Sequence, residues 1–442
     1  MSLDQIWRFQ TRPNNRRSNH TDNNHLSNLP YCFYGYKIFC FNIFEQCIGI
    51  HKFKYSMESA LASRKLQEVS DHTVPNSITF NSLLETHNDI LKDLLFNTNP
   101  LSRVRLMGGS SYPELTQAVG KHLGIDPVPV IARPFSSGEP HVIVQDNVRG
   151  MDVIIFQSIG RNINGCSTNY YYMELKLLID ACRRSNARSI TVVMPSYPYA
   201  RQDKKDQPRV PITASLVARE LEGAGATRVI TFDLHSAQIQ GFFQIPMDNL
   251  YAIDLLVGRL KEPELGIGPD THVLISPDNG GSKRVEAYAE TLKLSSLTRD
   301  KRRDHRDESV IVKSHLVGDV SLLKDKEAIV VDDMIDTAGT MVTCVEELVA
   351  QGIRSVILVI THGIFSGPGV KRLMECPHIR KVICTNTLPM DFAGFDKLEV
   401  VDISEMVADV LECIYTGQSV SKFFSDSKSR DHKHRSSLAS HS

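Results

Sequence analysis

The stretch "AIVVDDMIDTAGT", residues 328–340, decides how the centre of the chain is interpreted. Its first four residues are apolar and mostly β-branched, which predicts a buried strand. Asp332 and Asp333 then stand at the carboxyl end of that strand. Residues 336–340 are mainly small or hydroxylated and predict a turn ahead of a helix that begins near Met341. The stretch is therefore interpreted as one strand, turn and helix.

The same rhythm continues on both sides of this unit. Short β-branched runs alternate with segments whose apolar residues recur at helical spacing and which end in Gly. The runs are "VIIFQS", "SITVVMP", "RVITFDLH", "HVLISPD", "SVILVITHG" and "KVICTNTLP", and the helical segments include "PITASLVARELEGAG" and "GTMVTCVEELVAQG". This alternation predicts an α/β fold in which mainly parallel sheets are covered by helices. Ligands of such sheets bind beyond the carboxyl ends of the strands.

Composition limits the classes of function. The chain has 442 residues, enough for more than one domain, with 41% hydrophobic and 23% charged residues, as is ordinary for a globular protein. A formal charge of -1 gives no basic footprint for nucleic acid, so we expect no nucleic-acid partner. The cysteines include no C-x-x-C pair, which argues against a disulfide framework and a structural zinc site and suits the cytoplasm.

The two ends of the chain differ from its middle. Residues 1–30 are rich in Asn and Arg and predict disorder, and the tail from Ser425 is polar and basic. Residues 31–50 are aromatic and apolar, but charges interrupt them, and a membrane span needs about 20 predominantly apolar residues. We therefore expect no membrane segment. A degenerate targeting segment and a working start at Met57 are both open, and the sequence does not decide whether the residues before Met57 are translated.

The predicted turn can bind a phosphate. Its backbone N–H groups and the hydroxyls of Thr337 and Thr340 can surround an anion at the start of a helix, where negative charge is favoured. Gly339 allows the backbone to approach the anion closely. The alternative is a strand-to-helix turn whose polar residues serve only as N-caps.

The two carboxylates must serve another part of the ligand, because they would repel a phosphate at contact distance. Vicinal sugar hydroxyls are natural donors to them, so the unit predicts a ribose 5-phosphate site. The acidic pair binds the hydroxyls and the turn binds the phosphate. The residues of this predicted site are Asp332, Asp333, Asp336, Thr337, Ala338, Gly339 and Thr340.

These residues also resemble a known motif. "VVDDMIDTAGT" is similar to the phosphoribosyl diphosphate loop of type I phosphoribosyltransferase folds, which two families of different activity share. Five further stretches closely resemble ribose-phosphate pyrophosphokinases, also called phosphoribosyl pyrophosphate synthetases: "YPYARQDKKD", "DLHSAQIQGFF", "SPDNGGSKRV", "THGIFSGP" and "GQSVSKFFS". The resemblance covers about Arg105 to Ser425 and does not extend to the residues before it.

The resemblance implies two similar phosphoribosyltransferase-like α/β domains with the active site between them. Residues 104–255 would form the ATP-side domain and residues 256–425 the ribose 5-phosphate-side domain. Residues 1–100 would be an extension outside the family, largely disordered, and residues 426–442 a disordered tail. The implied reaction is attack of the anomeric hydroxyl of ribose 5-phosphate on the β-phosphorus of Mg-ATP, giving phosphoribosyl pyrophosphate and AMP for nucleotide biosynthesis. Mg2+ is the implied cofactor, and the implied assembly is a cytoplasmic homo-oligomer, built from dimers toward a hexamer.

Roles for single residues follow from the same resemblance. ATP contacts are implied for Arg201 and Gln202, and for Asp206 in the same loop. An arginine can fork two phosphate oxygens in a way that lysine cannot. His235 of "DLH" is implied in binding ATP and Mg2+, and Asp278 of "SPD" in binding Mg2+. Aspartate is a natural ligand of this hard ion, whereas histidine is unusual and could act through water.

A charged, mobile loop of the family carries two catalytic cations. Lys301 and Arg303 of "DKRR" match them, whereas the family's preceding His is Asp300 here. Both cations could neutralise charge that develops on the transferred group. Adenine contacts are implied for Glu139 of "FSSGE", in which Ser137 replaces the family's Asn or Asp.

The resemblance also implies regulatory residues. Arg209, Ser419 and Ser421 match family positions that bind phosphate or ADP at an oligomer interface. The nearby segment "QSIGRNINGCSTNYYYMEL", residues 157–175, is longer than its family counterpart and carries consecutive tyrosines. A tolerated surface insertion and altered regulation are both open.

Three other functions make different predictions for the sequence. A phosphoribosyltransferase would lack "ARQDKKD" and the partner domain. A non-catalytic, synthetase-associated regulatory subunit would keep the fold and assemble with paralogous subunits, but this chain retains all the charged positions assigned above. A dinucleotide-binding module lacks support because no G-x-G-x-x-G follows a first strand.

Overall fold

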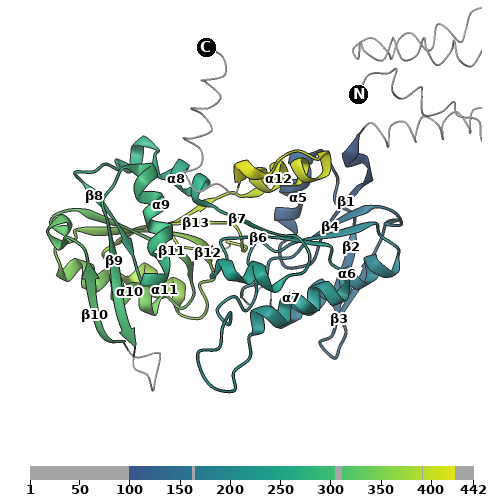
Figure 1. The fold of residues 1–442 in the computed structure, drawn as a ribbon, viewed down its shortest axis with the longest axis horizontal. Helices are drawn as coiled ribbons and strands as arrows, with labels where there is room; N and C mark the ends of the chain where they lie inside the picture. The colour runs from purple at the N-terminus through teal and green to yellow at the C-terminus, as the bar shows by residue number, and fades with distance from the viewer. Residues whose placement is uncertain (1–98, 162–164, 304–310, 391, 424–442) are drawn as a thin grey trace, which may run out of the picture. The chain divides into compact units, whose positions relative to one another are not determined.

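A computed structural model describes residues 99–161, 165–303, 311–390 and 392–423 (Figure 1). The chain divides into two units, Met1–Asn88 and Asp89–Ser442, and every described residue belongs to the second. The predictions for the N-terminal extension and for the tail therefore lie outside the described residues. The same holds for the middle of the predicted catalytic loop.

The first half of the described unit is built on five parallel strands in the order β1-β4-β5-β6-β7. Every neighbouring pair in it is parallel, so each connection crosses over a face of the sheet. β4 is buried along its whole length, as its apolar sequence requires. The strands are β1 (Val104–Gly108), β4 (Asp152–Phe156), β5 (Ser189–Val193), β6 (Arg228–Phe232) and β7 (Met247–Leu250).

The second half is built on seven strands in the order β10-β9-β8-β11-β12-β13-β14. Its pairs are parallel except for β9 and β10, which form an antiparallel hairpin at one edge. The strands are β8 (His272–Ser276), β9 (Ser296–Arg303), β10 (Ile311–Val317), β11 (Glu327–Ile335), β12 (Ser355–Gly363), β13 (Ile379–Thr385) and β14 (Leu398–Val401).

Helices cover both faces of this second sheet, and β11 explains how. Ile329 lies in one core cluster with Val285 of α9, whereas Val330 lies in another with Met341 and Leu348 of α10. Successive side chains of a strand point to opposite faces, so β11 is buried from both sides. The helices of the described unit are α5 (Pro113–Leu123), α6 (Thr168–Arg184), α7 (Thr213–Ala224), α8 (Ile253–Leu260), α9 (Ser282–Leu292), α10 (Gly339–Ala350), α11 (Gly369–Glu375) and α12 (Ser404–Thr416).

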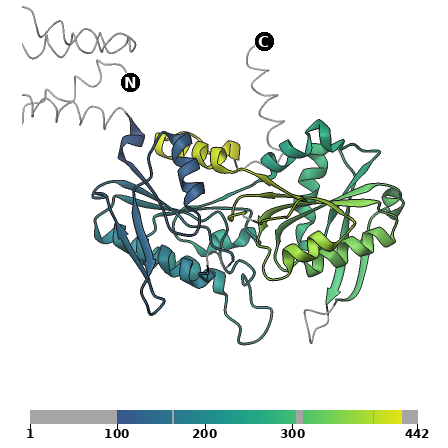
Figure 2. The same cartoon turned by 180° about the vertical axis from the view of Figure 1, so that it is seen from behind.

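Two features, the position of α12 and a separate hairpin, depart from a simple arrangement of two helix-covered sheets. The last helix, α12, lies beside α5 of the first half, and both contribute to one core cluster (Figures 1 and 2). The short strands β2 (Val130–Pro134) and β3 (Pro140–Val144) form a separate antiparallel hairpin. In both views this hairpin lies at the opposite end of the described unit from α10.

The predicted α/β fold with mainly parallel sheets is confirmed. One prediction for the opening unit was wrong. Its strand extends from Glu327 to Ile335 and includes the acidic pair, because β11 continues to pair with β12 beyond Asp332. The following helix begins at Gly339, near the predicted start at Met341.

The predicted catalytic loop also begins as a strand. β9 continues to Arg303 and pairs with β10, so "TRDKRR" is extended structure rather than loop. This stretch has no apolar alternation, and its pairing with the following strand therefore left no sequence signal.

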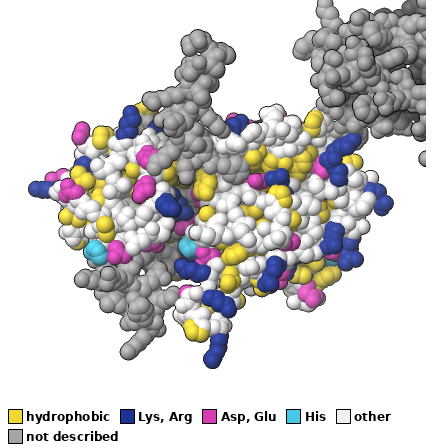
Figure 3. Space-filling model, viewed as in Figure 1, with side chains coloured by type: hydrophobic (Ala, Val, Ile, Leu, Met, Phe, Trp, Pro, Cys, Tyr) yellow, Lys and Arg dark blue, Asp and Glu magenta, His cyan; other side chains and the backbone are white. Residues whose placement is uncertain are grey.

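The visible surface carries both signs of charge. Figure 3 shows Lys and Arg side chains interspersed with Asp and Glu rather than gathered into one basic band. Across the residues that the structure describes, no helix has the length and apolar character needed to cross a membrane.

Candidate active site

Two segments of the first half reach the turn between β11 and α10. Nδ1 of His235, which follows β6, lies 2.8 Å from Oδ2 of Asp333. Nη1 of Arg201, in the loop before α7, donates to Oδ2 of Asp336 at 2.9 Å. The structure thus brings together residues that the sequence placed on the ATP side and on the ribose side.

Contacts with α11 support the β11–α10 turn. Ala338 has a left-handed conformation (φ 60°, ψ 0°), which costs a residue with a Cβ about 1–2 kcal/mol. Nη1 of Arg372 donates to the carbonyl oxygen of Thr337 at 2.9 Å. A Cβ on Gly369 would lie 2.5 Å from the carbonyl oxygen of Asp336, so only glycine permits this approach. The strained turn is therefore held by contacts that the turn sequence alone does not contain.

Asp332 and Asp333 have opposite electrostatic surroundings. Burial raises the pKa of Asp332 well above its ordinary value, and the neighbouring charge of Asp333 raises that pKa further. Burial alone would also raise the pKa of Asp333, but the hydrogen bond with His235 and the charge of Arg284 hold that pKa below its usual value. In turn, the hydrogen bond with Asp333 raises the pKa of His235. The pair therefore favours a single full negative charge until a cation or a ligand joins it.

Arg284 of α9 is a functional candidate that the sequence reasoning missed. Its Nη1 lies 3.7 Å from Oδ1 of Asp332 and 3.8 Å from Oδ1 of Asp333. It belongs to "SPDNGGSKRV", a stretch that was recognised, but only Asp278 was assigned a role there. A cation within a helix gives no sequence signal for the direction of its side chain, so its contact with the acidic pair was not predictable.

Asp278 lies at the start of the short helical turn η4 (Asn279–Gly281), after β8. Its Oδ1 accepts the N–H of Gly281 at 3.1 Å, and its charge contributes to the raised pKa of Asp332. No group of three or more His, Cys, Asp or Glu in the described ranges is arranged to hold a metal ion.

A buried polar network fixes the segment that carries His235. The hydroxyl of Thr361 donates to Oδ2 of Asp233 at 2.7 Å, and that carboxylate also accepts the N–H of Ala252 at 2.9 Å. His362 is buried, which lowers its pKa, and its Nε2 lies 3.1 Å from the carbonyl oxygen of Phe232. The network joins β6 to β12 and therefore holds the two halves in one arrangement.

Other predicted site residues are not brought to the β11–α10 turn. Ser137 donates to Oε2 of Glu139 at 2.9 Å, and both lie in the connection of the β2–β3 hairpin, far from α10 in Figure 1. The hydroxyl of Ser419 donates to Ser421 at 3.0 Å beyond α12. Arg209 is exposed.

The other predicted ATP-binding and catalytic residues lie in the loop before α7 and at the end of β9. Gln202 is exposed next to Arg201 and accepts a hydrogen bond from the hydroxyl of Thr213, while Asp206 is exposed further along the same loop. The backbone of Lys301 and Arg303 lies at the end of β9, and their side chains are outside the described part.

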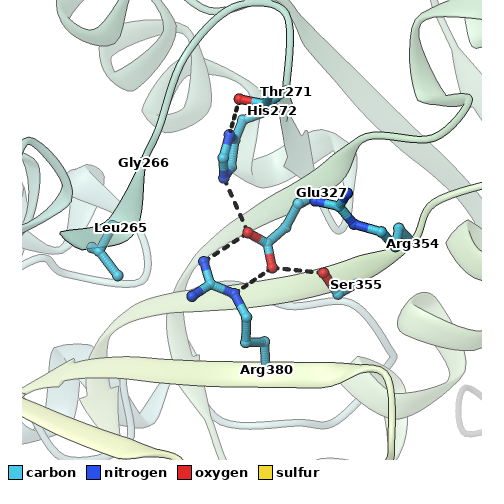
Figure 4. Close-up of a pocket in the computed structure, with 8 residues that line it drawn as sticks. All are labelled: Leu265, Gly266, Thr271, His272, Glu327, Arg354, Ser355 and Arg380. Atoms are coloured by element: carbon cyan, nitrogen blue, oxygen red, sulfur yellow. Dashed lines mark hydrogen bonds and ion pairs between the residues drawn. The ribbon is translucent and has the colours of Figure 1, made fainter. Parts of the chain in front are cut away.

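A pocket of about 370 Å³ lies at the other end of the second sheet (Figure 4). The carboxylate of Glu327 at the start of β11 receives two hydrogen bonds from Arg380, one from Ser355 and one contact from His272. These residues lie where β8, β11, β12 and β13 begin, whereas the turn lies where β11 ends. The pocket is therefore separate from the candidate active site, and its network ties four strands together.

Parallel sheets with this strand, turn and helix define a phosphoribosyltransferase-like class of protein. Residues 104–225 match the N-terminal domain of ribose phosphate pyrophosphokinase, and residues 310–425 match the phosphoribosyl synthetase-associated domain. The chain is 41% identical over 324 residues to ribose-phosphate pyrophosphokinase 4 of Saccharomyces cerevisiae, covering 73% of this chain and 95% of the relative.

Two further relatives agree. The ribose-phosphate pyrophosphokinase of Aquifex aeolicus is 41% identical over 324 residues, covering 73% of this chain and 100% of the relative. The crystal structure of phosphoribosylpyrophosphate synthetase from Mycobacterium smegmatis superimposes with a TM-score of 0.64 at 38% identity, covering 71% of this chain and 99% of that one. The chain belongs to the ribose-phosphate pyrophosphokinase family.

Proposed function

We propose that this chain is a ribose-phosphate diphosphokinase. The anomeric hydroxyl of ribose 5-phosphate attacks the β-phosphorus of ATP and loses its proton, while the bond from that phosphorus to the α–β bridging oxygen breaks. The products are phosphoribosyl pyrophosphate and AMP. The observation that carries the proposal is the pair of contacts between the halves, His235–Asp333 and Arg201–Asp336.

On the ribose side, the β11–α10 turn receives the 5-phosphate and the acidic pair receives the ring hydroxyls. Amides at the start of α10, with the hydroxyls of Thr337 and Thr340, suit an anion. Asp333 accepts hydrogen bonds in its charged form, and the cation of Arg284 beside it keeps it so. Asp336, Ala338 and Gly339 complete the turn.

On the ATP side, Arg201 would release the carboxylate of Asp336 and bind phosphate oxygens of ATP instead. Its ion pair with Asp336 is half exposed, so exchange costs little. Gln202 and Asp206 lie in the same loop, and Ser137 with Glu139 are proposed for the adenine.

The donor set around the turn fits Mg2+. This ion keeps several waters and takes one or two carboxylates with substrate phosphates, rather than a full protein cage. Asp278 would supply a carboxylate, and His235 would supply a ring nitrogen directly or through water. When bound, Mg2+ would screen the phosphate charges of ATP. Around it, Arg201 and His235 orient the nucleotide and Asp333 orients the sugar.

Catalysis is proposed for Lys301 and Arg303, whose charges would stabilise the transferred group.

Arg209, Ser419 and Ser421 are proposed regulatory positions. The proposed assembly is a cytoplasmic homo-oligomer built from dimers, and the alternative is an assembly with paralogous subunits. Light scattering of the purified chain tests that assembly directly.

The decisive experiment is an AMP-release assay on the purified full chain with ATP, Mg2+ and ribose 5-phosphate. Turnover that requires all three and disappears in Lys301→Ala supports the proposal. A folded chain that neither binds nucleotide nor releases AMP would refute it and would favour the non-catalytic, synthetase-associated subunit instead.

A further inference from the structure

The pairing of strand β9 with β8 ends shortly before the proposed catalytic residues. The strand pairs with β8 at Ser296, Leu297 and Thr298. From Arg299 onward its ladder partner is β10, and β10 is the edge strand of the sheet. A two-stranded ribbon has little stiffness of its own. The direction of β9 beyond this point must therefore be set by side-chain contacts at its base.

Arg299 makes such a contact. Its side chain is only 1% exposed, and its Nε and Nη2 each lie 2.7 Å from the carboxylate of Glu347 on α10. The geometry is bidentate, which fixes the angle between the two groups as well as their distance. Because α10 begins at the β11–α10 turn, the pair joins the base of β9 to the helix that carries the proposed phosphate site.

Stability alone does not explain this pair. The guanidinium of Arg299 is buried, which is costly, whereas the side chain of Glu347 is 40% exposed, and an ion pair with an exposed partner contributes little to stability. The best-attested use of such a pair is to fix one register or arrangement. The next residue supports this view, since Nδ2 of Asn279 donates to Oδ1 of Asp300 at 2.7 Å. Successive residues of β9 are thus held to α10 and to η4, the segment that follows Asp278.

We propose that the Arg299–Glu347 ion pair fixes the direction of β9 and thereby sets the position of Lys301. Arg299 is buried two residues before Lys301, at roughly 3.3 Å of strand per residue, so it acts through the strand and not by touching a substrate. This inference rests on the proposed function, because it concerns what aims the proposed catalytic cations. A small displacement at the base of the strand would misplace them at its end, and misplacement by about 1 Å can cost about a hundredfold in rate.

The test compares the double variant Arg299→Met/Glu347→Met with the wild-type full chain. Two apolar side chains of similar length replace the pair, so we expect a Tm near that of the wild type. We expect kcat to fall about tenfold or more while KM for ATP and for ribose 5-phosphate stays within about twofold. A kcat and a Tm that both equal the wild-type values would overturn the inference.

The control is Arg380→Met, which breaks a second bidentate pair at the far end of the same sheet, one in which the carboxylate of Glu327 is the buried partner. It should lower Tm and leave kcat unchanged, since it lies outside the candidate active site. If the double variant does not fold, Glu347→Gln decides, because it removes the charge but keeps an acceptor. A folded Glu347→Gln chain with wild-type kcat would count against the inference, and a lowered kcat with unchanged KM would support it.

Hydrogen exchange separates this inference from the proposed function. In the double variant, amides of β9 should exchange at least about fivefold faster while those of β11 keep their wild-type rates. If the wild-type chain released no AMP, the proposed function would fail, and this exchange result would still decide whether the ion pair anchors the strand. Equal exchange rates in β9 would reject the anchor.

Discussion

At the scale of single residues, Asp332 and Asp333 are adjacent in the sequence but have different electrostatic surroundings. Asp333 is 7% exposed, yet His235 and Arg284 compensate its charge. Asp332 lies 3.7 Å from the same arginine, and burial together with its neighbour's charge raises its pKa. The asymmetry arises from His235, which follows β6, and from Arg284 on α9, and therefore from the tertiary fold.

The first prediction concerns Asp333→Asn. The amide is similar in size but removes the acceptor charge that faces the proposed ribose hydroxyls. A hydrogen bond to a charged group contributes about 1.5–3 kcal/mol, so KM for ribose 5-phosphate should rise about tenfold or more while KM for ATP changes less. Steady-state AMP release with each substrate varied in turn measures both constants.

Its control is Asp325→Asn, an exposed turn residue with a positive φ of 61° that asparagine also tolerates. That variant should match the wild type. A larger effect of Asp333→Asn on ATP than on the sugar would contradict the assignment of the acidic pair.

The residue roles were only partly accessible from the sequence. The acidic pair and the turn could be assigned to one strand–turn–helix unit, because a strand pattern directly precedes "DDMIDT" and a helix pattern directly follows it. Arg284 and Arg372 were missed because each lies on a different helix, α9 or α11, and reaches the site through its side-chain direction. Periodicity predicts which face of a helix is apolar, but it does not predict where one cation on the other face points.

At the scale of elements, the β11–α10 turn depends on a helix that contributes no side chain to the proposed ligand contacts. α11 approaches so closely that the backbone of Gly369 lies against the carbonyl of Asp336. Ala338, in its left-handed conformation, needs such support to persist.

The second prediction is that Gly369→Ala damages the turn. The new Cβ would lie 2.5 Å from the carbonyl oxygen of Asp336, and α11 or the turn must shift. We expect Tm to fall and KM for ribose 5-phosphate to rise at least about threefold, with KM for ATP less affected. Thermal unfolding and steady-state kinetics on one preparation measure all three quantities.

Gly258→Ala is the matched control, because Gly258 lies inside α8 and no atom lies within 4 Å of an added Cβ. Replacing glycine by alanine within a helix stabilises it by up to about 1 kcal/mol. That variant should retain or raise Tm with unchanged kinetics. Equal behaviour of the two alanine variants would contradict the proposed role of α11.

Elements were predictable where apolar runs are long. "VIIF", "VILVI" and "AIVV" gave β4, β12 and β11 because buried parallel strands are apolar throughout. β9 was not predicted because its buried position is filled by Arg299, whose charge is compensated by a residue 48 positions away. No local pattern contains that partner.

At the scale of the whole described unit, the two halves contact each other outside the candidate active site as well as at it. α12 from the end of the chain packs beside α5, and Thr361 of β12 bonds Asp233 after β6. These contacts join segments more than a hundred residues apart, so composition and periodicity cannot indicate them. Loss of either sheet should therefore affect the other.

The network around Glu327 gives the last prediction, which concerns acid stability. Burial alone would raise the pKa of Glu327, but hydrogen bonds from His272, Arg380 and Ser355 lower it to about 2. A carboxyl group with a lowered pKa in the folded state stabilises the fold above its unfolded pKa of about 4.5 and loses this contribution as pH falls toward 2. The full contribution is of the order of 3 kcal/mol.

Glu327→Gln should therefore unfold at a lower urea concentration than the wild type at pH 7, and the gap between the two midpoints should narrow steadily from pH 4.5 to pH 3. Kinetic constants at pH 7 should not change, since the network lies at the amino ends of the strands. The exposed Glu262→Gln serves as control and should stay within about 0.5 kcal/mol of the wild type at every pH. A gap for Glu327→Gln that stays constant or widens on acidification would show that the ionised carboxylate does not hold these four strands together.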